Sequence, residues 1–213
     1  MKKTSTRFIV EALTRAIVAH RLVPGEKLVE QRLAEQFGVS RTLVRQALFQ
    51  LSQKHLIVME PARGAKVASP SVAEAQQVFA VRRMLESGMV RAFMACATST
   101  DINALRMHID QEKAAVESND ITNRTHLLGD FHVCMAQLMG NTVLAQLLSD
   151  LTSRCTLAAM MYQTTAAAHH SYEEHSAILH AIESRNELLA LQLMDSHLCN
   201  VEKALAFPLG TAP

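Results

Sequence analysis

The sequence is poor in the residues that build β-rich or disulfide-linked proteins. Tryptophan is absent and aromatic residues make up 4% of the 213 positions, whereas hydrophobic residues make up 49%. Aliphatic side chains must therefore form the core, which favours helices over a β-sandwich. The four cysteines include no C-x-x-C pair, which indicates reduced and mostly buried thiols.

The chain also has no long apolar segment. No hydrophobic run approaches the roughly 18 residues that a membrane-spanning helix needs. The N-terminus starts basic but soon carries Glu11, Arg15 and His20, which is not typical of a signal peptide. We therefore expect a cytoplasmic protein with no membrane partner.

Charge is divided unevenly along the chain, although the formal net charge is only +1. Residues 1–69 contain 12 Lys/Arg and 5 Glu, a net of +7, whereas residues 70–213 carry a net of −6. A basic segment of this kind indicates a module that meets a polyanion, followed by an acidic module with another role. A chance distribution of solvated charge is the alternative, and charge alone does not decide between them.

The basic segment has the pattern of three short helices followed by a β-hairpin. The first helix ends before Pro24, the second is capped by Gly38, and the third begins after the N-cap residue Ser40. Two β-rich runs joined at residues 61–64 form the hairpin. This order of elements is typical of a winged helix-turn-helix domain.

A domain boundary is predicted near residue 69, and the chain beyond it has helical periodicity throughout. The predicted fold is therefore mainly α, with a winged helix-turn-helix in residues 1–69 and an all-helical bundle in residues 70–213. About six helices are expected in the bundle, at residues 72–97, 100–118, 121–139, 142–165, 169–184 and 187–206.

Two arginines, Arg41 and Arg45, begin the third helix one turn apart and opposite its apolar stripe. In a helix-turn-helix, the N-terminal residues of the second helix of the pair face base edges in the major groove. The planar guanidinium suits both guanine edges and phosphates. At the hairpin tip, Arg63 and Gly64 are candidates for the minor groove, because glycine allows close approach of the backbone. A winged helix that binds protein is the alternative.

These residues carry a family resemblance. "GEKLVEQRLAEQFGVSRTLVRQAL" followed by "RGAKV" resembles the DNA-binding domain of GntR-family bacterial repressors over residues 6–69. The resemblance implies that Arg41, Thr42, Arg45 and Gly64 contact DNA, and Gln31 stands where some members use arginine. It also implies a double-stranded DNA operator, near-palindromic and bound by a homodimer, because each subunit reads one half-site.

Two positions depart from that family pattern. Leu43 stands where proline is usual, and Gln46 stands where glutamate is usual. Both lie near the start of the predicted recognition helix, so we expect them to alter operator preference more than the fold.

Ten histidines are present, and eight of them follow residue 100. His132, His175 and His197 lie on three different predicted helices, each beside apolar neighbours at helical spacing. If they converge, three imidazoles form a three-nitrogen site for zinc, nickel or a similar ion. From spacing alone, three ordinary core or surface histidines are the better interpretation.

A second resemblance changes that weighting. "FHVCMAQLMGN" and "EEHSAILHAIESRNELLALQLMDSHL" are similar to the helical FCD ligand-binding domain of the FadR-type GntR subfamily, over about residues 72–206. Many such domains hold a divalent metal with one aspartate and three histidines, and His132, His175 and His197 match the three histidines. Leu128 stands where the aspartate is usual. The resemblance implies a zinc or nickel cofactor, and loss of the metal because of Leu128 is the competing interpretation.

The resemblance further implies that the helical domain binds an organic acid effector and forms the dimer. Arg82 matches an arginine that can hold an anionic effector, and its alternative role is a salt bridge with Glu86 at i+4, worth roughly a few tenths of a kcal/mol. Asn141 is a second candidate for the effector, and its alternative role is to cap the next helix.

Together these features predict a ligand-responsive transcriptional repressor and no enzymatic activity. A metalloenzyme that uses the three-histidine site is the alternative, and it needs an acid or base beside the metal. Glu174 and Asp195 adjoin ligand histidines in sequence, but helical geometry is expected to turn both away from the metal. Nor does an enzyme account for the basic first domain.

Overall fold

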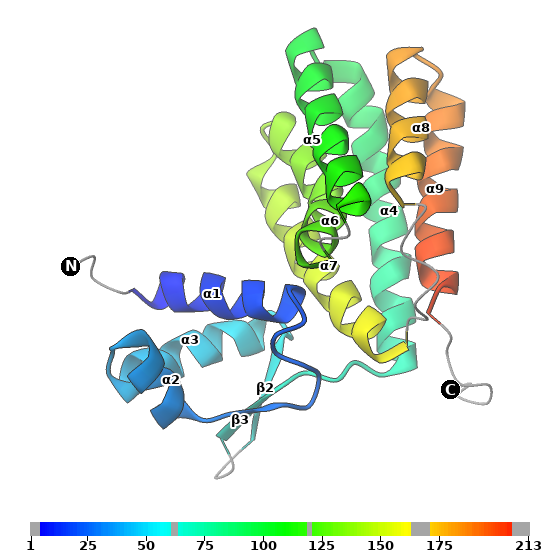
Figure 1. The fold of residues 1–213 in the computed structure, drawn as a ribbon. Coiled ribbons are helices and arrows are strands. Elements are labelled where there is room, and N and C mark those ends of the chain that lie inside the picture. The colour runs from blue at the N-terminus through cyan, green and yellow to red at the C-terminus, as the bar shows by residue number, and fades with distance from the viewer. Residues whose placement is uncertain (1–4, 61–63, 119–120, 163–170, 206–213) are drawn as a thin grey trace.

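The computed structural model describes residues 5–60, 64–118, 121–162 and 171–205, and side chains between residues 121 and 162 only from Leu127 onward. In that part of the chain, two mainly helical units lie side by side (Figure 1). The predicted class is confirmed: a small winged helix-turn-helix precedes an all-helical bundle. The predicted boundary near residue 69 falls between the last strand of the first unit and the first helix of the second.

The first unit contains helices α1 (Thr6–Val18), α2 (Glu30–Phe37) and α3 (Arg41–Gln53) and a small antiparallel sheet. Its strands are β1 (Lys27–Leu28), β2 (Ile57–Glu60) and β3 (Gly64–Val67), in the order β1-β3-β2. The β2–β3 hairpin was predicted, but β1 was not. A two-residue strand is too short to show alternation in the sequence.

The turn between α2 and α3 has the predicted caps. Gly38 ends α2 at φ +65°, a left-handed conformation that glycine adopts without strain. Ser40 begins α3, and its hydroxyl oxygen accepts a hydrogen bond from the backbone N–H of Leu43 at 3.3 Å. On the inner face of α3, Val44 and Leu48 are fully buried. These local rules fix which face of α3 remains in solvent.

The second unit contains α4 (Val72–Cys96), α5 (Ser99–Glu117), α6 (Ile121–Leu138), α7 (Thr142–Tyr162), α8 (Ser171–Glu183) and α9 (Glu187–Lys203). All six correspond to predicted helices, with ends that differ by at most three residues. The predicted end of α7 at residue 165 and start of α8 at residue 169 lie outside the described residues.

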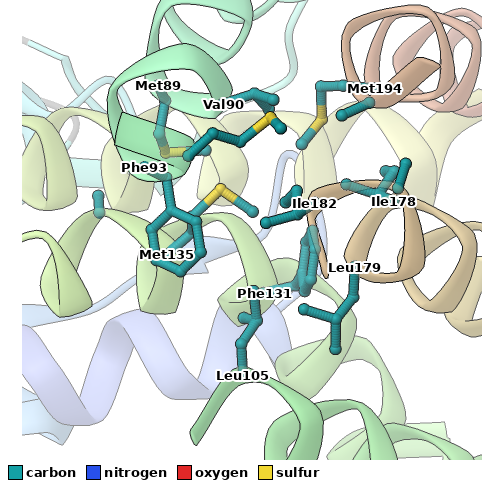
Figure 2. Packing of buried hydrophobic residues seen from close by; sticks show 14 of the residues in the cluster. Met89, Val90, Phe93, Leu105, Phe131, Met135, Ile178, Leu179, Ile182 and Met194 are labelled. Atoms are coloured by element: carbon teal, nitrogen blue, oxygen red, sulfur yellow. The ribbon is translucent and has the colours of Figure 1, made fainter. Parts of the chain in front are cut away.

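Aliphatic, Met and Phe side chains from five of these helices form the bundle core. Figure 2 shows Phe93, Phe131 and Met135 at its centre, with Met89 and Met194 above them. Phe131 and Met135 lie one turn apart on α6 and are fully buried. The low aromatic content is therefore concentrated where the bundle needs bulk.

Helix α7 joins the two units. Leu157 on α7 is buried in the core cluster of the first unit, and α1 packs against α6 and α7. Lys54 Nζ lies 2.7 Å from Asp150 Oδ1 across the same junction. The Tyr162 hydroxyl donates a hydrogen bond to the Pro70 carbonyl at 3.1 Å. The DNA-binding unit thus rests directly on the helical bundle rather than hanging from a free linker.

None of the helices in the described ranges combines the length and the apolar character that crossing a membrane requires.

Candidate functional site

The first candidate site is the exposed face at the start of α3. Arg41 and Arg45 project from it with side chains 65% and 73% exposed. A hollow of about 580 Å³ opens between α2, α3 and the sheet, and both arginines line it together with Gln31 and Gly64. Gly64 has φ +91°, in the left-handed region that favours glycine.

The structure therefore brings four of the predicted DNA-contact residues to one groove. Thr42 lies in an adjoining hollow of about 560 Å³, which shares Arg45 and Met59 with the first. Arg63 lies outside the described residues, so its predicted role stays a prediction. Gln31 also donates a hydrogen bond to Glu35 along α2, at 2.7 Å.

The second candidate site is a buried histidine centre inside the bundle. His132 from α6, His175 from α8 and His197 from α9 converge, and one ring nitrogen from each lies within 4.8 Å of the other two. All three side chains are buried. The predicted convergence is confirmed, because packing of the three helices places these faces at one point.

Each histidine of the centre is held at Nδ1 by a glutamate from another part of the bundle. The contacts are His132 to Glu86 at 2.5 Å, His175 to Glu112 at 2.9 Å and His197 to Glu174 at 2.7 Å. Because an ionised carboxylate only accepts hydrogen bonds, each Nδ1 carries the proton and each Nε2 presents a lone pair. Such carboxylate–histidine pairs orient imidazoles for a metal ion.

The spacing of the lone pairs fits a metal ion. His175 Nε2 and His197 Nε2 lie 3.3 Å apart. Two nitrogens bound to one tetrahedral zinc at 2.0–2.1 Å lie roughly 3.3 Å from each other. With both Nδ1 atoms protonated, the facing Nε2 lone pairs repel unless a cation or a proton lies between them.

Burial and a neighbouring cation keep the centre in a ligating state. Burial lowers the pKa of His132 to about 3, although Glu86 acts in the opposite direction. Burial alone raises the pKa of Glu86, but Arg82 and His132 outweigh it and bring the value to about 2. Since Arg82 is a permanent cation, Glu86 is ionised and His132 is neutral near pH 7. Burial also lowers the pKa of His197.

The Arg82–Glu86 pair corrects a sequence-based estimate. The expected alternative was an ordinary i,i+4 salt bridge, but both side chains are buried, with Arg82 Nε 2.7 Å from Glu86 Oε1. A buried pair cannot be assigned the small energy of a surface pair, because loss of one partner leaves an uncompensated charge. Arg82 Nη2 is buried without a hydrogen-bond partner among the described residues.

Glu174 corrects a second expectation. It was expected to point away from the centre because it is next to His175 in sequence. It does leave the side of α8 that carries His175, but it reaches across to His197 on α9 and to Asn200, whose Nδ2 donates to it at 2.6 Å. The argument from one helix ignored the neighbouring helix.

Glu112 was missed, although the sequence held a signal for it. It is fully buried and lies on the same stripe of α5 as Leu105, Ile109 and Ala115. A carboxylate in an apolar stripe needs a buried partner. Its partners are His175 and also His108, whose Nε2 lies 3.3 Å from Glu112 Oε1.

Asn141 has the capping role. Its Oδ1 accepts a hydrogen bond from the backbone N–H of Leu144 at 3.0 Å, at the exposed start of α7. Its predicted contact with an effector stays a prediction. Leu128 lies outside the cluster, and among the described residues the centre has no carboxylate in the direct ligand set.

A basic winged helix-turn-helix joined to a helical bundle with a buried polar centre defines a class of DNA-binding regulators. Family models bear this out. The model described as "Bacterial regulatory proteins, gntR family" matches residues 5–67, and the "FCD domain" model matches residues 77–200. The chain belongs to the GntR family, in the FadR-type branch with an FCD domain, and is a DNA-binding transcriptional regulator.

Individual relatives agree. The chain is 30% identical to the "Uxu operon regulator" of Haemophilus influenzae, over 85% of this chain and 74% of that protein. It is 23% identical to the "HTH-type transcriptional repressor RspR" of Escherichia coli, over 92% and 87%. Among solved structures, "E. coli McbR/YncC" has a TM-score of 0.84 at 19% identity, over 95% and 97% of the two chains, which shows the fold. These relatives are named as regulators, which supports the regulator over the metalloenzyme.

Acidification should destabilise the metal-free protein. The folded pKa of His132, about 3, lies below its ordinary 6.5, so the unfolded chain takes up the proton first and stability falls from about pH 6.5 downward. Glu86, with a folded pKa of about 2, adds a loss below about pH 4.5. His197 acts in the same direction, while His108, whose pKa is raised, opposes it.

The measurement is the urea midpoint of chelator-treated protein at pH 7 and at pH 4.5, in the wild type and in His132→Asn. We expect a lower midpoint at pH 4.5, with a smaller drop in the variant. Equal midpoints for the wild type at the two pH values would show that the buried histidines do not favour the neutral form.

Proposed function

We propose that the protein is a repressor that binds a near-palindromic operator as a homodimer and responds to a small carboxylate sensed at a divalent metal in the helical domain. In this proposal it acts in the cytoplasm, where bacterial DNA lies. The observation that carries the sensing part is the 3.3 Å approach of two Nε2 atoms whose Nδ1 atoms are both held by glutamates.

Metal binding is supported by the whole donor set. Three buried neutral imidazoles face one point, and an exposed or flexible cluster would not fix them so well. A His₃ set suits zinc, and imidazole also suits nickel. When bound, the ion supplies a Lewis-acidic centre with coordination positions that the protein leaves open for a ligand.

The effector proposal rests on Arg82. Its Nη2 is a buried donor without a partner among the described residues, and its positive charge acts on both His132 and His197. A carboxylate that reaches the open coordination positions can accept from this donor. The effector would then be anionic at one end and small enough for the bundle interior.

The homodimer proposal is supported by the outer face of α4. Met84 is 77% exposed, Val81 is 42% exposed one turn before it, and Gly88 is exposed one turn after it. A helix face with exposed large apolar residues and a small residue is suited to burial against a second copy.

Removal of one histidine should remove the metal. Elemental analysis of untagged protein purified without chelator should give about one zinc or nickel per chain. His175→Ala should lose it, because a three-ligand site is reduced to two, whereas His180→Ala, an exposed histidine on the same helix, should keep it. Glu112→Gln should weaken metal affinity about 10- to 100-fold. Equal metal content in the wild type and His175→Ala would remove His175 from the ligand set.

Small carboxylates should stabilise the metal-loaded protein more than the chelated one. A ligand at about 100 times its Kd adds about 2.7 kcal/mol to the free energy of unfolding, which a thermal-shift screen of mono- and dicarboxylates detects. Arg82→Lys keeps a cation beside Glu86 but loses the second donor, so it should bind the best carboxylate about tenfold more weakly. Undiminished binding by Arg82→Lys would contradict the role of Arg82.

Truncation of Arg45 should weaken operator binding. With an operator selected by the wild type from random duplexes, Arg45→Ala should lose about 1–3 kcal/mol of binding free energy. Arg106→Ala, a surface arginine in the helical domain, is the control. Titration should give two wild-type chains per operator. Unchanged affinity in Arg45→Ala would refute the recognition-helix assignment, and one chain per operator would refute the dimer.

A further inference from the structure

A carboxylate lies among the arginines of the DNA-facing groove. Glu30, the first residue of α2, has a side chain only 15% exposed, yet it lies between the two exposed guanidinium groups. Its Oε1 is 3.4 Å from Arg45 Nε, and its Oε2 is 3.5 Å from Arg41 Nη2. One ordered acidic group is thus shared by the two arginines placed to read DNA.

Such a group works against simple affinity for DNA. A carboxylate in the groove repels phosphates, and it occupies donors that a phosphate could otherwise take. The groove has a second acid, Glu60, but that carboxylate lies 2.6 Å from Lys66 on the neighbouring strand. Glu30 therefore differs from Glu60 in that its ion-pair partners are the candidate DNA-reading groups themselves.

We propose that Glu30 is a positioning residue for sequence discrimination. It holds the heads of Arg41 and Arg45 over the groove, where a base edge can be met, and it competes with the phosphates of non-specific DNA for them. The ordering helps only where a guanine edge is present, whereas the competition acts on every sequence. The inference rests on the proposed contacts of Arg41 and Arg45 with DNA.

A purely structural role for Glu30 is also available, because an acidic residue in the first turn of a helix stabilises it through the helix dipole. That role predicts a change in thermal stability without a change in the ratio of operator to non-specific affinity. The ratio is therefore the quantity to measure.

Glu30→Gln and Glu35→Gln form a matched pair on α2. Each removes one negative charge, but Glu35 accepts from Gln31 and does not line the groove. Kd should be measured for the selected operator and for a scrambled duplex of equal length, at several salt concentrations. For Glu30→Gln we expect several-fold tighter non-specific binding, a steeper salt dependence by up to about 0.9 in log–log slope for each phosphate gained, and a roughly tenfold lower ratio of operator to non-specific affinity.

Glu35→Gln should leave that ratio unchanged. An equal ratio in the wild type, Glu30→Gln and Glu35→Gln would overturn the proposal. Glu30→Asp supplies a second test, because it keeps the charge but shortens the reach to both arginines. It should lower operator affinity with little change in non-specific affinity, and an unaltered operator affinity would likewise count against positioning.

Combination with Arg45→Ala separates the two proposals. If Arg45→Ala weakens operator binding and Glu30→Gln leaves the ratio intact, only the role of Glu30 fails. If Arg45→Ala leaves operator binding unchanged, the recognition-helix assignment itself fails. If Glu30 acts through its arginines, Glu30→Gln should change the ratio less in the Arg45→Ala background than in the wild type, and an equal change in both would contradict action through Arg45.

Discussion

The helical domain depends on a buried arrangement of charge that runs from Arg82 through Glu86 to His132. A carboxylate this deep is tolerable only because a permanent cation and an imidazole lie against it. The same contacts fix which nitrogen of His132 carries the proton. Glu112 and Glu174 impose the same orientation on His175 and His197. Three lone pairs therefore meet at one point because three carboxylates, from three helices, hold the opposite nitrogens.

Helix α6 connects this centre with the DNA-binding unit. His132 projects from one side of it, while Gly129 and Val133 line a small hollow of about 80 Å³ shared with Thr14 and Arg15 of α1. A ligand at the centre can alter DNA binding only if it favours one packing of α6 over another. The buried Leu157 and the Lys54–Asp150 pair limit how the two units move against each other.

Most of the fold follows from local signals. Ser40 and Gly38 place the helix-turn-helix, because caps act through hydrogen bonds and backbone angles within a few residues. Strand β1 escaped notice because its two residues pair with β3, which lies almost forty positions away. The three histidines could be nominated from helical spacing and resemblance, but their glutamate partners could not all be placed. Each partner comes from a different stretch of chain.

By itself the sequence determined the order of elements, the basic first domain and the arginines that begin α3, because periodicity, capping and charge are properties of short segments. It also identified the histidine set through family resemblance. Only the tertiary structure decided that Arg82 and Glu86 are buried, that Glu174 serves His197 rather than its own helix, and that Glu30 lies between Arg41 and Arg45. Those contacts join separate helices or depend on burial, so they are set by packing geometry that no local pattern encodes.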